Sequence, residues 1–371
     1  MRKENADKSN LVFWEPKIGD VERKLVSEVL DSNFLNDGDV TTLFEDQLAE
    51  LLGCKYVVTV TSGTAAIFLS LAGLGVGPGD EVIVPDVTFI ATANAVVMTG
   101  AQPVLVDVDP STFNIDPQAV ARAITPQTRA VIPVHVSGRA ANLSAILEIA
   151  EKHGISVVED AAEAFMSRVD GKCLGTFGKA GCLSFSPNKT ITTGQGGAIL
   201  TNDSHLHTRF RELKDQGRPV RGTGGDDVHR AVGYNFKFTN LQAAVGLGQL
   251  TFLETRVERM KGIYRRYVEG LSGVEEILLP GFNIETGETP QWTDALVENR
   301  DDLVQHLRSH GINCRPFWFP MHWHAPYRLP DDRFPNSTRL VPRAFWLPSA
   351  FTLTDQDVDT VCGHIREFFQ G

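Results

Sequence analysis

Short apolar runs alternate with helical patterns from residue 55 to about residue 200, and no other feature constrains the fold of this chain as strongly. Each run is short enough to form one buried strand, and the segments between the runs show helical periodicity. Such an alternation predicts an α/β fold with a largely parallel sheet. The predicted strands are Val57–Val60, Glu81–Pro85, Val104–Val108, Ala130–Val134, Ile155–Glu159, Leu183–Phe185 and Ala198–Thr201.

Residues that favour helix ends flank the segments between these strands. Asp116 and Pro117 suit the N-cap and the first position of a helix, and Gly154 suits the end of one. The predicted helices are Ala65–Leu74, Ala91–Met98, a helix that begins at Asp116-Pro117, and Leu143–His153.

The last third of the chain has a different pattern. An apolar repeat over residues 241–271 predicts one long helix that links a large domain to a smaller one. We therefore predict a large α/β domain over residues 1–250, N-terminal segment included, and a smaller α+β domain over residues 251–371. Further helices are predicted near Asp301–His310 and Asp355–Phe369.

The composition excludes several classes of protein. The 371 residues carry a net charge of −11 without a basic patch, which argues against nucleic acid and anionic membranes as partners. The five cysteines are scattered with no CxxC pair, so neither a zinc site nor a disulfide framework is expected. We also find no histidine with a metal partner at a suitable spacing. The polar start Met1–Asn10 and the lack of a long apolar run predict a cytoplasmic protein.

Lys189 is the residue that most clearly indicates a catalytic role. It lies in the run Ser184–Thr190 among small residues and proline, with no neighbouring charge, just before a glycine-rich stretch. A pocket that disfavours the charged ammonium would free this amine to attack a carbonyl and form a Schiff base. The alternative is a lysine that extends from a loop edge into solvent.

Three further features fit an active site with Lys189. The turn Thr61–Thr64 lies between a strand and a helix, where backbone amides form an anion site, although an ordinary capped turn is the alternative. Asp160 ends a buried strand, at the sheet edge where ligands bind, and either holds a pyridinium N–H or caps the next helix. Phe89 either stacks on a planar ring or packs in the core. Together these residues describe a site for pyridoxal 5′-phosphate (PLP).

Six segments of the sequence resemble one protein family. The segments SGTAAIFLSL, GPGDEVIVPDVTFIATANAV, AQPVLVDVDPSTFNID, VVEDAAEA, SFSPNKTITTGQGGAILTND and YNFKFTNLQAAVGLGQL resemble the DegT/DnrJ/EryC1/StrS sugar aminotransferases, over roughly residues 12–370. Residues 181–250 and RPFWFPMH at 315–322 are most similar to GDP-perosamine synthase-type 4-aminotransferases. The resemblance implies PLP-dependent fold type I, as in aspartate aminotransferase, with a mixed, mostly parallel sheet in the large domain.

The resemblance also implies a role for each matching residue. Lys189 is expected to carry the cofactor as a Schiff base and to shuttle the proton, and Asp160 to pair with the pyridine nitrogen. Phe89 is expected to stack on the ring, with Glu163 near its 3-hydroxyl. The phosphate ligands are expected to be Gly63, Thr64 and Ser184. Asn235 matches an asparagine that the family supplies from a neighbouring subunit, which implies a homodimer with a shared active site.

Departures from the family pattern concern the sugar site. Lys237 stands where arginine is common, Phe319 where histidine is common, and Glu288–Ala295 lacks the usual aromatic residues. Glu163, expected near the 3-hydroxyl of the cofactor, also stands where glutamine or histidine is common. Candidate substrate contacts are Arg315, Trp318 and His322, with packing as the alternative for the two ring side chains. Candidate cations for a pyrophosphate are Lys237, Arg218, Arg221, Arg230 and Arg315, and Arg218–Asp227 is predicted to be a mobile loop.

The expected activity is transfer of an amino group from L-glutamate to a keto-sugar, a nucleotide-linked 4-keto-6-deoxyhexose. One alternative is a sugar dehydratase of the same fold, but that group replaces the Schiff-base lysine by histidine, whereas Lys189 is present. Another alternative is an aminotransferase for a cyclitol or a keto-sugar without a nucleotide. A third is a non-catalytic protein that retains the fold. The sequence does not name the sugar, the nucleotide or the pathway.

Overall fold

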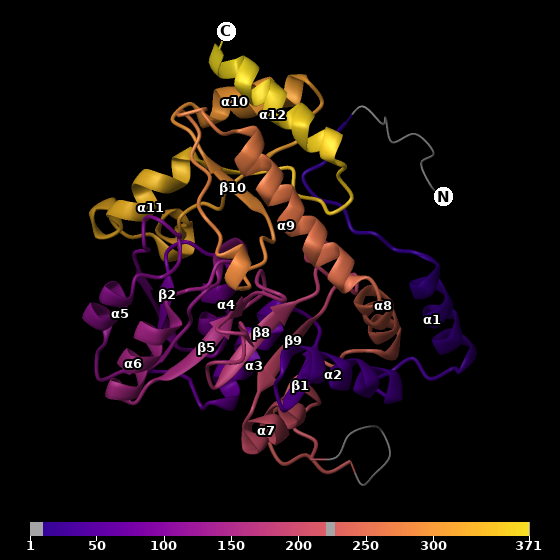
Figure 1. The fold of residues 1–371 in the computed structure, drawn as a ribbon. Helices are drawn as coiled ribbons and strands as arrows, with labels where there is room; N and C mark the ends of the chain where they lie inside the picture. The colour runs from indigo at the N-terminus through magenta and orange to yellow at the C-terminus, as the bar shows by residue number, and fades with distance from the viewer. Residues whose placement is uncertain (1–9, 220–226, 371) are drawn as a thin grey trace.

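The computed structural model describes residues 10–219 and 227–370. A seven-stranded sheet forms the centre of the larger part, with strand order β1-β9-β8-β5-β4-β2-β3 (Figure 1). All neighbouring pairs are parallel except those made by β9, which runs against β1 and β8. The strands are β1 Tyr56–Val60, β2 Glu81–Pro85, β3 Gln102–Val106, β4 Thr128–Val131, β5 Ser156–Asp160, β8 Ala180–Ser184 and β9 Gly197–Thr201.

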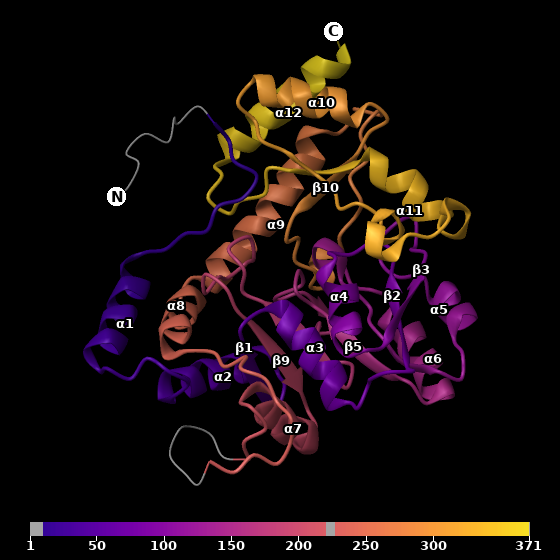
Figure 2. The same cartoon turned by 180° about the vertical axis from the view of Figure 1, so that it is seen from behind.

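Helices cover both faces of this sheet because successive strand residues point to opposite sides. Val58 packs with α3 (Gly63–Gly73) and α4 (Ala91–Met98), whereas its neighbour Val57 packs with α2 (Asp39–Leu52) on the other face. Beside α2, α5 (Pro117–Ala123) and α6 (Leu143–His153) cover the strands farther along the sheet. The two faces are seen from opposite sides in Figure 1 and Figure 2.

The C-terminal part contains a small antiparallel sheet in the order β10-β12-β11. Helices α9, α10 and α12 pack around one apolar cluster beside this sheet (Figure 1). Leu11, near the start of the described chain, forms a parallel bridge with Ile312 of this part. Its elements are β10 Thr293–Leu296, β11 Arg315–Pro316, β12 Ala344–Leu347, α9 Leu253–Gly270, α10 Arg300–Ser309, α11 Pro335–Leu340 and α12 Asp355–Gln370.

The prediction of one continuous helix over residues 241–271 was wrong. The segment forms α8 (Asn240–Leu250) and α9, with a turn at Thr251 and Phe252. Gly246 and Gly248 let α8 lie close to Phe44 and Glu22 in the larger part, while α9 packs its apolar face in the C-terminal cluster. α8 packs in the core of the larger part and α9 packs in the core of the C-terminal part, so the chain changes direction between them. The domain boundary at residue 250 stays a prediction.

Other predicted elements are present with shifted ends. β3 and β4 both begin two residues before the predicted strands. They also end earlier, because Val108 forms only an isolated bridge with Ile115 and Val134 one with Asp160. Most of the predicted loop Arg218–Asp227 lies outside the described residues. The remaining elements are α1 Asp20–Asp31, α7 Ser204–Lys214 and the hairpin of β6 Arg168–Val169 and β7 Lys172–Cys173. Among the described residues, no helix is long and apolar enough to cross a membrane.

A buried ionic network joins α2, β1 and α7. Glu45 of α2 accepts hydrogen bonds from the amide and hydroxyl of Thr59 and pairs with Arg211 and Lys214 of α7. Lys214 also contacts Asp37, 3.2 Å away. Burial raises the pKa of Glu45, but the two cations and the Thr59 hydrogen bonds outweigh it, so this pKa lies below its ordinary value of 4.5.

We expect Glu45→Gln to lower the free energy of unfolding by roughly 3–5 kcal/mol at pH 7, because it leaves buried Lys214 with one carboxylate fewer. The folded-state pKa of Glu45 is depressed, so its stabilisation is present above pH 4.5 and is lost as pH falls through the lower folded value. Denaturant unfolding of both proteins should therefore show a difference that narrows in acid. Glu50→Gln, an exposed change on the same helix, is the control; equal losses in both variants would contradict this account.

Candidate active site

A cavity of about 380 Å³ lies at the carboxyl ends of the parallel strands. β1, β5 and β8 point the same way, so the residues that follow or end them meet at one edge of the sheet. Of the predicted site residues, nine line this cavity: Gly63, Thr64, Phe89, Asp160, Glu163, Ser184, Lys189, Arg315 and Trp318.

Lys189 extends into the cavity from the loop after β8. Its Nζ lies 3.2 Å from Oε1 of Glu163 and 4.8 Å from the ring centre of Trp292, and only 11% of its side chain is exposed. Glu163 Oε2 also accepts a hydrogen bond from the amide of Ser137. Burial raises the pKa of Glu163, and the nearby Lys189 acts in the opposite direction. Lys189 Nζ and the Glu163 carboxylate therefore form one close ion pair inside the cavity.

Asp160 lies at the end of β5 with its carboxylate in the cavity. Oδ2 accepts a hydrogen bond from the hydroxyl of Thr92 (2.8 Å), and Oδ1 accepts one from the amide of Ala162 (3.1 Å). Burial raises the pKa of Asp160, while these hydrogen bonds and Lys189 oppose the rise. The preceding Glu159 points to the opposite face, as strand alternation requires, and accepts backbone hydrogen bonds there.

The N-terminus of α3 forms another wall of the cavity. Ser62 caps this helix by accepting the amide of Ala65, which leaves the amides of Gly63 and Thr64 at the first turn without helical partners. A side chain at position 63 would come within 3.0 Å of Ser184 Cβ, so glycine lets the backbone approach the Ser184 hydroxyl. These groups form a donor cradle for an anion.

Aromatic side chains form the outer wall. Phe89 is 54% exposed, which is unusual for a core residue. Trp318 packs against Trp346, with ring centres 5.2 Å apart, and the Arg315 guanidinium lies 5.4 Å from the ring of Trp346. The planar, apolar part of a ligand could therefore stack on Phe89, and the Arg315 guanidinium lines the same cavity.

Two predicted site residues do not line the cavity. Asn235 is exposed and pairs through its backbone with Asp215. His322 is fully buried, and its Nδ1 lies 2.6 Å from Asp86 Oδ2 while its ring stacks on Phe334. This geometry gives no support to the predicted contact between His322 and substrate, because its surroundings are those of a packed core histidine.

The candidate cations differ in their partners. Lys237 pairs with Asp215 and Arg218 with Asp227, each at 2.7 Å, and Arg221 lies outside the described residues. Arg315 lines the cavity, and no carboxylate pairs with it in the part of the chain that the structure describes. Arg230 is exposed and lies away from the cavity wall.

Sequence reasoning missed two residues of this site. Thr92 orients Asp160 from α4, and its own hydroxyl is 2.7 Å from that of Thr88. Trp292 lies over Lys189 from the turn before β10. Thr92 follows Thr88 by only four residues, so this contact is local in the sequence. Trp292, in contrast, is 103 residues from Lys189, and no local pattern joins them.

A ligand cavity at the carboxyl edge of a mostly parallel sheet, with a helix N-terminus, buried carboxylates and one lysine, defines an α/β enzyme for an anionic ligand. The chain belongs to the DegT/DnrJ/EryC1/StrS aminotransferase family, whose model matches residues 16–366. The fold class predicted from the sequence, that of the fold-type I aminotransferases, is thereby confirmed.

Known relatives cover almost the whole chain. GDP-perosamine synthase from Caulobacter vibrioides is 38% identical over 368 residues, which cover 96% of this chain and 97% of the relative. The structure of DesV from S. venezuelae with a ketimine intermediate has a TM-score of 0.90 at 34% identity, with 94% of each chain covered. TlmJ, an aminotransferase from Streptoalloteichus hindustanus, has a TM-score of 0.91 at 33% identity, covering 97% of this chain and 99% of TlmJ.

Thr92→Val should lower the free energy of unfolding by about 1–3 kcal/mol, because it keeps the shape of Thr92 but leaves an oxygen of buried Asp160 without its donor. Thr92→Ser keeps the hydroxyl and should lose clearly less. Denaturant unfolding of the three proteins compares them. A loss in Thr92→Val no larger than that in Thr92→Ser would contradict a stabilising role for the hydrogen bond between Thr92 and Asp160.

Proposed function

We propose that this chain is a PLP-dependent aminotransferase that transfers the amino group of L-glutamate to a nucleotide-linked 4-keto-6-deoxyhexose. The observation that carries the proposal is the position of Lys189, whose Nζ reaches the cavity beside two buried carboxylates. Membership of an aminotransferase family supports the reaction, and the similarity to GDP-perosamine synthase supports the substrate class. Localisation in the cytoplasm stays a prediction.

The residues of the cavity fit PLP. The first-turn amides of α3 and the Ser184 hydroxyl suit its phosphate, since a side chain at Gly63 would fill the cradle. Asp160 is a buried acceptor suited to a ring N–H, and exposed Phe89 offers a stacking surface. When bound, PLP supplies an electron sink that makes the α-proton of an amino donor acidic.

Lys189 is assigned the proton transfers. Its Nζ would take the proton from the α-carbon of the donor and deliver it to the cofactor, as one general base and acid. Glu163 Oε1, 3.2 Å away, holds Nζ in place and can accept its proton and return it. Trp292 covers the amine from one side and limits the access of water. Asp160, which Thr92 holds in place, would pair with the ring nitrogen of the cofactor and keep it protonated.

A homodimer with a shared site is part of this proposal. Asn235 is exposed and lies outside the cavity of its own chain, so it is accessible to a second subunit. We assign it to the cofactor phosphate of the neighbouring subunit, as the resemblance to the family implies. We assign Arg315 to the pyrophosphate of the nucleotide-sugar, because it lines the cavity and no carboxylate of the described residues pairs with it.

Lys189→Ala should reduce kcat for amino transfer at least 10²–10⁴-fold, the contribution expected from general acid–base catalysis alone. Lys189→Arg keeps a cation beside Glu163 but cannot release its proton at neutral pH, so it should be equally inactive. Formation of 2-oxoglutarate from L-glutamate and a GDP-linked 4-keto-6-deoxyhexose measures both. Lys55→Ala, an exposed lysine, is the control. Turnover by folded Lys189→Ala would refute the assignment.

Arg315→Ala should raise the Michaelis constant for the nucleotide-sugar about 10–150-fold, since a charge-assisted hydrogen bond contributes roughly 1.5–3 kcal/mol. The constant for L-glutamate should stay unchanged. Arg122→Ala, which removes an exposed arginine of α5 that does not line the cavity, should leave both constants unchanged. A rise for glutamate alone would instead place Arg315 at the carboxylate of the amino donor.

A further inference from the structure

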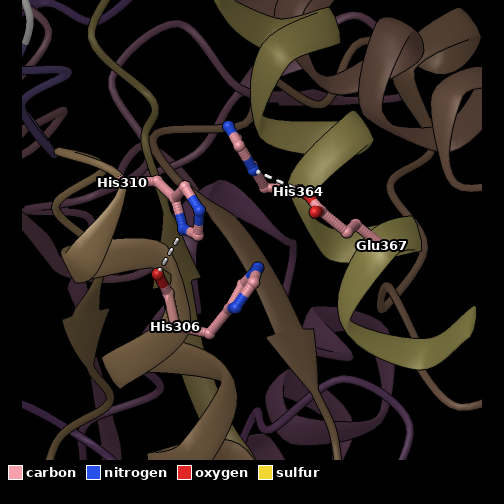
Figure 3. A group of neighbouring side chains, drawn as sticks. All are labelled: His306, His310, His364 and Glu367. Atoms are coloured by element: carbon pink, nitrogen blue, oxygen red, sulfur yellow. Dashed lines mark hydrogen bonds and ion pairs between the residues drawn. The ribbon is translucent and has the colours of Figure 1, made fainter. Parts of the chain in front are cut away.

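Three histidines and a glutamate meet between two helices of the C-terminal part, apart from the residues that line the active-site cavity (Figure 3). His306 and His310 come from α10 and its C-terminal end, and His364 and Glu367 come from α12. One ligand atom from each of the four side chains lies within 4.8 Å of the others. The amino-transfer reaction uses none of these residues.

The sequence spacing places these side chains on facing surfaces. Residues four apart on α10 and three apart on α12 lie on one side of each helix. The helices are fixed against each other by a buried core, with Leu303 and Leu307 on α10 and Val361 and Ile365 on α12. The four side chains therefore start from a rigid support, which lowers the cost of ordering them around a ligand.

Hydrogen bonds orient two of the rings. His310 Nδ1 lies 2.9 Å from the backbone carbonyl of His306, and a carbonyl can only accept, so this nitrogen carries the proton. That leaves Nε2 of His310 with a free lone pair. His364 Nδ1 lies 3.2 Å from Glu367 Oε2. A ring fixed through one nitrogen with the other free is the arrangement in which metal-binding histidines occur.

His306 provides a separate indication. Its Nε2 is buried and has no hydrogen-bond partner in the described part of the chain. Phe368 packs beside the ring, with centres 5.4 Å apart, and keeps that side apolar. Buried polar atoms are nearly always satisfied, so this nitrogen needs a partner that the protein itself does not provide.

We propose that His306, His310, His364 and Glu367 bind one Zn²⁺ or a similar transition-metal ion, which joins the C-terminal helix α12 to α10. Three imidazoles and one carboxylate suit such ions, whereas Mg²⁺ and Ca²⁺ prefer oxygen ligands. Tetrahedral ligands 2.1 Å from zinc lie about 3.4 Å apart, so small side-chain rotations close the site. His310 and Glu367 are exposed, which gives the ion a path from solvent.

This proposal differs from the expectation that no histidine has a metal partner at a suitable spacing. His306 and His310 have the spacing of a helical ligand pair, but the partners on α12 lie more than 50 residues farther along the chain. The proposed site stands independently of the amino-transfer function, because it shares no residue with the cavity.

Calorimetric titration of the full chain, without an affinity tag and after removal of metals with a chelator, tests the site with ZnCl₂ as the only probe. We expect one Zn²⁺ per chain and a rise in the melting temperature with added zinc, because the ion binds the folded state. His310→Ala and His364→Ala should each weaken binding at least tenfold and abolish the rise. MgCl₂ should produce neither effect.

His153→Ala is the matched control, since His153 is also exposed in the last turn of a helix. It should bind zinc as the unaltered chain does. Absence of zinc binding by the unaltered chain would overturn the proposal. Unchanged affinity in both His310→Ala and His364→Ala would overturn it equally, because zinc would then bind elsewhere on the protein.

Discussion

The parallel alignment of β5 with β4 and β8 is the constraint on which the site depends. The pairing of Asp160 with Cys182 in register places the end of β5 beside Ser184 at the end of β8. A strand pair that runs antiparallel at this position would put the two side chains at opposite edges of the sheet. β9 is the exception, and its reversed direction returns the chain from the Lys189 loop into the sheet.

Burial sets the electrostatics of the cavity. Asp160 and Glu163 are both buried, and burial raises the pKa of each, while Lys189 is the cation within contact distance of Glu163. Two carboxylates against one ammonium leave an excess of negative charge when all are ionised. A protonated pyridine ring beside Asp160 would balance that charge, and the anionic phosphate would bind apart from it, at the N-terminus of α3.

Sequence alone predicted those parts of the fold and site that depend on local patterns. Asp160 directly follows an apolar strand, and Gly63 stands at a strand–helix turn, so each could be located without knowledge of tertiary contacts. The break between α8 and α9 could not, because α8 packs against Phe44 in one core, whereas α9 places its own Ile263 in another. The surroundings of His322, for which packing was the alternative, could not be predicted for the same reason, since its partner Asp86 is 236 residues away.

The absorption spectrum of the PLP-loaded protein, recorded before and after addition of L-glutamate alone, tests the central claim most directly. It needs no knowledge of the sugar, because the first half of the reaction involves only the donor and the residues around Lys189. We predict that the visible band of the bound cofactor decreases as a near-ultraviolet band of the aminated form grows, with one 2-oxoglutarate released per site. A bound cofactor whose spectrum glutamate leaves unchanged would contradict the account.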